Sequence, residues 1–102
     1  MPKSTAQLLE QSQRIGVQFL LADLAAALTF LDVAEVTKWE GTRDRNRQNA
    51  RAVYDTVLRL LPKLSPSGDE RAVLELRLAE LKSRLIDLGY AHEPETERRT
   101  GT

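Results

Sequence analysis

The hydrophobic residues of this chain recur at helical spacing in three segments separated by turn-forming residues. In the first segment, residues 5–38, one set of apolar residues falls within about 100° of arc when successive residues are placed about 100° apart. A stripe of that width is typical of an amphipathic helix that faces a core. This stripe consists of Val17, Leu20, Leu21, Leu24, Leu28 and Leu31.

The same segment carries a second apolar stripe on nearly the opposite side. Its members are Ile15, Phe19, Ala26, Phe30 and Val33, and Asp23 lies at its edge. A helix that is apolar on two sides either lies between other helices or contacts a second chain. Asp23 is expected to have a polar partner or partial exposure, because an unpaired buried carboxylate is costly.

Turn signals separate the first segment from two further helices. Gly41 is expected to end the first helix and Thr42 to cap a second helix over residues 43–63. Trp39, in this link, is expected to cover the open edge of the hairpin, and a binding contact is the less favoured alternative. The apolar face of the second helix consists of Ala50, Val53, Val57, Leu60, Leu61 and Leu64, widened by Tyr54 and Leu58.

Prolines and serines mark the start of the third helix. Ser65, or Ser67 with Glu70, is expected to cap it, and Gly89 to end it. Glu80 and Arg84 are spaced for an i, i+4 pair. A heptad seam along this helix is formed by Leu74, Leu78, Leu81, Leu85 and Leu88.

These elements predict an all-α fold, an antiparallel three-helix bundle of long helices joined by short turns. Ser4 and Gln7 fit a capping box at the start of the first helix. A break at Gly16 would add a fourth, short N-terminal helix. The bundle is expected to occupy residues 1–89 as one domain, followed by a disordered polar tail over residues 90–102.

Composition narrows the chemistry that the chain can support. The 102 residues include 15 basic and 15 acidic side chains, no cysteine and one histidine. Without cysteine there is no disulfide, thiolate nucleophile or thiolate metal site, so a cytoplasmic location is expected. The N-terminal residues lack the continuous apolar stretch of a secretory signal. Polar residues interrupt the most apolar region, so no membrane span is expected.

The arginines of the second helix suggest two readings. Arg43, Arg47 and Arg51 lie on one edge of that helix and could form a basic patch for nucleic acid. In an antiparallel hairpin, however, Arg43 and Arg47 come level with Glu35 and Asp32 of the more acidic first helix. Internal pairing is therefore the favoured interpretation, and nucleic-acid binding is the alternative.

No pattern for catalysis, a cofactor or a metal ion stands out. His92 lies in the expected tail, and no second histidine is present to complete a histidine metal site. Gly41 and Gly68 each stand alone, so no glycine-rich phosphate loop is formed. We therefore expect a non-enzymatic protein, with no catalytic, cofactor-binding or metal-ligating residue.

The run "ARAVYDTVLRLLP" resembles the second helix of a tetratricopeptide repeat. Ala50, Tyr54, Val57 and Pro62 match the repeat's small, aromatic, branched and proline positions. The pairing of this helix with a leucine-rich third helix is also similar to MIT domains. The whole chain looks like small uncharacterised helical proteins of bacterial genomes. The repeat likeness implies an interaction module, and no functional residue is transferred from any of these families.

Taken together, these features predict a helical protein-protein interaction or self-association module. Its partner would be another protein or a second copy of the chain in a homodimer. The candidate interface is the second stripe of the first helix, at Ile15, Phe19, Phe30 and Val33. The alternative is a nucleic-acid-binding domain that uses Arg43, Arg47 and Arg51.

Overall fold

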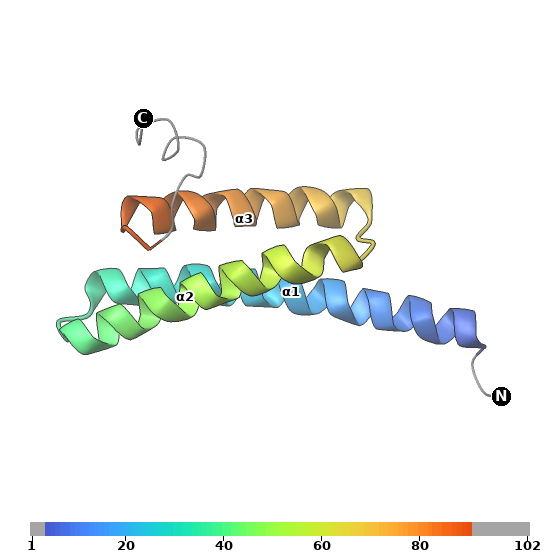
Figure 1. Ribbon diagram of the computed structural model, residues 1–102, viewed down its shortest axis with the longest axis horizontal. Helices are drawn as coiled ribbons and strands as arrows, with labels where there is room; N and C mark the ends of the chain where they lie inside the picture. The colour runs from blue at the N-terminus through green and yellow to red at the C-terminus, as the bar shows by residue number, and fades with distance from the viewer. Residues whose placement is uncertain (1–3, 91–102) are drawn as a thin grey trace, which may run out of the picture.

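The computed structural model describes residues 4–90 and arranges them as three antiparallel helices (Figure 1). The helices are α1 (Thr5–Val36), α2 (Glu40–Leu60) and α3 (Gly68–Asp87), with a short 3₁₀ turn, η1 (Leu61–Lys63), after α2. Each helix packs against the other two, and residues 4–90 contain no strand. The predicted all-α three-helix bundle is confirmed.

The core is made of the apolar faces that the sequence predicts. Leucines and valines of all three helices are fully buried, and each such side chain contributes roughly 1.5–3 kcal/mol relative to exposure. Smaller alanines are buried among them and let the helices approach closely. The buried residues are Val17, Leu20, Leu24, Ala27, Leu31, Ala34, Ala50, Val57, Leu74, Leu81 and Leu85.

α1 is one uninterrupted helix of 32 residues. Ser4 and Gln7 form the expected capping box at its start, with hydrogen bonds of 2.9 and 3.2 Å. Gly16 does not break the helix, so the fourth helix is absent from the described residues. Gly16 instead provides room for Leu64, whose Cδ2 would lie 2.8 Å from a β-carbon built at this position. The N-terminal end of α1 extends beyond the loop between α2 and α3 (Figure 1).

The turn between α1 and α2 lies earlier than the sequence suggests. α1 ends at Val36 and α2 begins at Glu40, so Gly41 and Thr42 lie inside the first turn of α2 and Thr42 does not cap it. Trp39 occupies the N-cap position without a side-chain hydrogen bond and is 74% exposed, so it does not cover the hairpin edge as expected. Arg43 reaches back across the turn and donates a 2.9 Å hydrogen bond to the Thr37 carbonyl oxygen. That contact satisfies a carbonyl just beyond the end of α1, which explains how the turn closes without a glycine.

α3 has a well-defined cap at each end. Ser67 and Glu70 form the capping box at its start, as one of the two sequence alternatives proposed. Gly89, at φ +81°, ends it, with hydrogen bonds from Gly89 N to the Ile86 oxygen (3.0 Å) and from Tyr90 N to the Leu85 oxygen (2.8 Å). This is the Schellman arrangement. Tyr90, which the sequence interpretation assigned to the tail, packs against the core, and residues 91–102 lie outside the described part.

Candidate functional site

One face of α1 is left uncovered by the other two helices. Along it, Leu8, Ile15, Phe19 and Val33 are 55%, 61%, 56% and 41% exposed. The residues of this face follow alternating steps of four and three: Leu8, Ser12, Ile15, Phe19, Ala22, Ala26, Thr29 and Val33. We call these eight residues the α1 stripe. Such spacing is the heptad pattern with which one helix packs along another.

The structure separates the four interface residues that the sequence proposes. Ile15, Phe19 and Val33 belong to the α1 stripe, whereas Phe30 is half-buried and packs against the core. The sequence prediction did not include Leu8 and Ala22, although each lies one heptad, seven residues, from Ile15. Asp23 is partly exposed, which is one of the two alternatives that the sequence suggests for this carboxylate.

An apolar groove of about 330 Å³ adjoins the N-terminal half of the α1 stripe. Leu64, packed on Gly16, contributes to one wall, and Lys63 brings a cation to the groove. Gln13 fixes this wall, because its side chain bonds the Lys63 carbonyl oxygen (3.2 Å) and the Ser65 N–H (2.9 Å). The groove is lined by Ser12, Ile15, Gly16, Phe19, Leu20, Leu60, Lys63 and Leu64.

α1 is also long and apolar enough, by length and composition alone, to cross a membrane. The core helix of a soluble bundle meets the same criterion. In α1, the face carrying Leu20, Leu24 and Leu31 is buried against α2 and α3. Outside that face, accessible apolar residues of α1 include Leu8, Ile15, Phe19 and Val33 of the α1 stripe, and Leu9 and Val36 near the two ends of the helix.

The acidic end of α1 is paired with α3, and the predicted pairing with α2 is wrong. Arg84 forms ion pairs with Asp32 (3.0 Å) and Glu35 (2.9 Å), which also replaces the expected Glu80–Arg84 pair. Arg43 instead donates to the Thr37 carbonyl. The sequence could not reveal this, because an arginine on α3 reaches α1 only through the tertiary packing.

The basic patch proposed at Arg43, Arg47 and Arg51 is largely engaged within the chain. Arg51 pairs with Asp55 at 3.1 Å and donates to the Tyr90 carbonyl oxygen. The Arg47 Nε is buried without a hydrogen-bond partner among the described residues. Phosphate binding needs free, converging cations, and two of these three arginines are already hydrogen-bonded.

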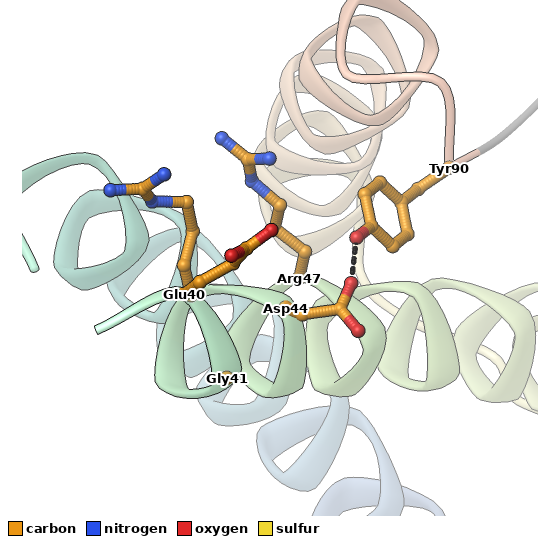
Figure 2. Close-up of a pocket in the computed structure, with 6 residues that line it drawn as sticks. Glu40, Gly41, Asp44, Arg47 and Tyr90 are labelled. Atoms are coloured by element: carbon orange, nitrogen blue, oxygen red, sulfur yellow. Dashed lines mark hydrogen bonds between the residues drawn. The ribbon is translucent and has the colours of Figure 1, made fainter. Parts of the chain in front are cut away.

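A second hollow, of about 540 Å³, lies beside the start of α2 (Figure 2). Its lining mixes acidic and basic groups: Glu40, Gly41, Arg43, Asp44, Arg47 and Tyr90. The Tyr90 hydroxyl donates a hydrogen bond to the Asp44 carboxylate, which raises the pKa of Tyr90 above its ordinary value of 10.0. A tyrosine held protonated next to a carboxylate is a structural contact that ties the end of α3 to α2.

The described residues contain no cluster of metal-ligating side chains. Within residues 4–90, no three acidic or histidine side chains lie close enough together to hold a metal ion. His92 lies outside the described residues. The α1 stripe is therefore the candidate site that the geometry develops furthest.

Comparison with known proteins gives no relative: no family model, curated protein or solved structure matches the chain. The structure gives no basis for the tetratricopeptide-repeat or MIT resemblance. α1 alone spans 32 residues, nearly the length of a whole two-helix repeat of about 34 residues.

Proposed function

We propose that the protein is a non-enzymatic interaction module that binds a protein helix along the α1 stripe. The observation that carries this proposal is the heptad-spaced row of eight residues from Leu8 to Val33, of which six are apolar and seven are exposed. Single exposed apolar residues are common on soluble proteins, but a row of them along one helix face is characteristic of an interface.

The energetics support a helical partner. Covering apolar surface contributes about 25 cal/mol per Å², and a second helix can interdigitate with side chains repeated at steps of four and three. Ser12 and Thr29 add hydroxyls at two of the eight positions, and the row itself carries no charge. A partner helix with its own apolar seam would therefore meet no buried charge along this row.

The alternatives have weaker support. Nucleic-acid binding would use Arg43 and Arg51, whose guanidinium groups are hydrogen-bonded within the chain. Membrane insertion of α1 would require its buried face to leave the core and would bring Asp23 and Asp32 toward the bilayer interior. A cytoplasmic module remains part of the proposal.

Sedimentation velocity with the purified protein and with the Phe19→Glu variant tests this function. We expect the wild type to form a concentration-dependent complex, with its own copy or with an added partner, that Phe19→Glu abolishes. The matched control is Leu76→Glu, which also changes a largely exposed apolar residue but on α3. Circular dichroism checks that both variants remain folded.

The proposal fails if association is unaffected by Phe19→Glu in a folded protein. It also fails if Leu76→Glu and Phe19→Glu weaken association equally, since the contact would then not be specific to the α1 stripe.

A further inference from the structure

We infer that the α1 stripe is self-complementary and that its occupant is the α1 stripe of a second copy, running antiparallel. This inference rests on the proposed function and names the partner. In the register that fits best, the two-fold axis passes between the two α1 helices, at the level midway between Phe19 and Ala22.

The register follows from the order of large and small residues along the stripe. Placing the axis between Phe19 and Ala22 brings Phe19 opposite Ala22 of the second copy and Ile15 opposite Ala26 of the second copy. Further out, Ser12 meets Thr29 and Leu8 meets Val33. Large side chains thus face small ones next to the axis, the two hydroxyl residues face each other, and the outermost pair is aliphatic. Well-packed helix interfaces use this alternation of large and small residues.

A parallel pair of the same stripes packs less well. Each residue would then face itself, so a layer of two Phe19 side chains would adjoin a layer of two Ala22 side chains. The two helix axes would have to lie far apart at the Phe19 layer and close together at the Ala22 layer. A straight pair of helices cannot do both, so voids would remain that cost free energy.

Charge supports the antiparallel arrangement as well. Asp23 lies on the same edge of α1 as Ser12 and Gly16, the edge next to the groove that Lys63 lines. With the axis between Phe19 and Ala22, Asp23 of the second copy comes level with Gln18. The backbone of Lys63 lies next to Gln13, whose side chain donates to the Lys63 carbonyl oxygen. Gln13 is five residues from Gln18, or about 7.5 Å along the helix. The Lys63 side chain can span such a distance, and by symmetry the Asp23–Lys63 pair would form twice.

The size of the stripe sets the expected strength. From Leu8 to Val33 α1 rises about 38 Å, and at a width of about 10 Å the stripe offers roughly 400 Å² on each copy. Stable complexes typically use about 800 Å² per partner. The dimer should therefore be weak and concentration-dependent.

The absence of native cysteine allows a direct test by crosslinking. Ile15→Cys and Ala26→Cys are prepared as two single-thiol proteins and treated with a short bifunctional maleimide, separately and as a mixture. The antiparallel register predicts a covalent dimer in the mixture alone, because each thiol faces the other variant. In either variant alone the two thiols would be separated by eleven residues, about 16 Å along the axis. Leu8→Cys with Val33→Cys repeats the test at the outer pair if an inner variant does not fold.

Each outcome decides the inference. A covalent dimer that forms in the mixtures and not in the single variants supports the antiparallel pair. Crosslinks within the separate variants would indicate a parallel pair and overturn the inference. An equal yield when Leu76→Cys, on α3, replaces one of the two variants in the mixture would also overturn it, because the crosslink would then not be specific to the α1 stripe. Absence of crosslinks in every mixture also overturns it. If Phe19→Glu still abolishes binding to a different protein in that case, the proposed function survives while the second-copy assignment fails.

Discussion

Gly16 of α1 lies directly against Leu64 at the end of the α2–η1 segment, so close that a β-carbon on Gly16 would approach the Leu64 Cδ2 to 2.8 Å. This contact holds the groove wall against α1. It also explains why a glycine is placed within a long helix, where it costs about 1 kcal/mol relative to alanine.

The effect of Gly16→Ala on the free energy of unfolding should therefore depend on the residue at position 64. In a Leu64→Ala background, the new methyl group has room, and we expect Gly16→Ala to raise the free energy of unfolding by about 1 kcal/mol. With Leu64 in place, repacking should cancel that gain or reverse it by about 1 kcal/mol. Urea unfolding of the four proteins gives the coupling energy. Additive effects would contradict the close contact.

The two phenylalanines of α1 should behave differently. Phe30 packs against the core, so Phe30→Ala should lower the free energy of unfolding by about 2 kcal/mol or more. Phe19 is 56% exposed, so Phe19→Ala should change it by less than about 0.5 kcal/mol. The measurement is urea unfolding at low protein concentration, where association does not contribute. Similar losses for the two variants would contradict the division between core and stripe.

Arg84 joins α3 to the acidic end of α1. Asp32 and Glu35 are about two-thirds exposed, so solvent screens both ion pairs. We expect Arg84→Met to lower the free energy of unfolding by about 0.5–1 kcal/mol at low salt, and by less in 1 M sodium chloride. Arg71→Met, at an exposed position on the same helix, is the control. A loss that does not change with salt would show that these ion pairs are not its cause.

The capping box of α3 should make stability sensitive to acid. The backbone N–H of Ser67 donates to the Glu70 carboxylate (2.8 Å) and lowers the pKa of Glu70 below its ordinary 4.5. Because the folded pKa is depressed, this contribution is present above pH 4.5 and is lost as the pH falls through the folded value. Glu70→Gln keeps an acceptor oxygen but cannot titrate.

Thermal unfolding of wild type and Glu70→Gln, followed by circular dichroism from pH 7 to pH 3, measures this effect. The advantage of the wild type over the variant should shrink as the solution is acidified below pH 4.5. A difference between the two proteins that stays constant over the whole range would contradict the shifted pKa.

Sequence patterns predicted the elements and the core because burial follows helical periodicity closely. The buried leucines of α1 and α3, the capping box of α1 and the Gly89 end of α3 were expected, and the capping box of α3 was one of two alternatives. The α1–α2 turn was misplaced because Gly41 was taken as the end of a helix. Thr37 and Trp39 form the turn instead, and Arg43 from α2 satisfies the Thr37 carbonyl, a contact that no local pattern encodes.

The candidate site was predicted only in part. The second stripe was visible in the sequence, but whether other helices cover it depends on where α2 and α3 pack. Phe30 lies eleven residues after Phe19, which rotates it by about 20° around the helix, and the structure finds it half-buried against the core. The pairing of Arg84 with Asp32 and Glu35 likewise depends on tertiary packing.

Hydroxyl-radical footprinting over a hundredfold range of protein concentration measures whether the α1 stripe of one copy binds the α1 stripe of a second. We expect oxidation of Leu8, Ile15, Phe19 and Val33 to fall as concentration rises, whereas oxidation of the more exposed Leu76 and Trp39 stays constant. Oxidation of all six residues that does not change with protein concentration, or protection of Leu76 instead of Phe19, would contradict this contact between two copies.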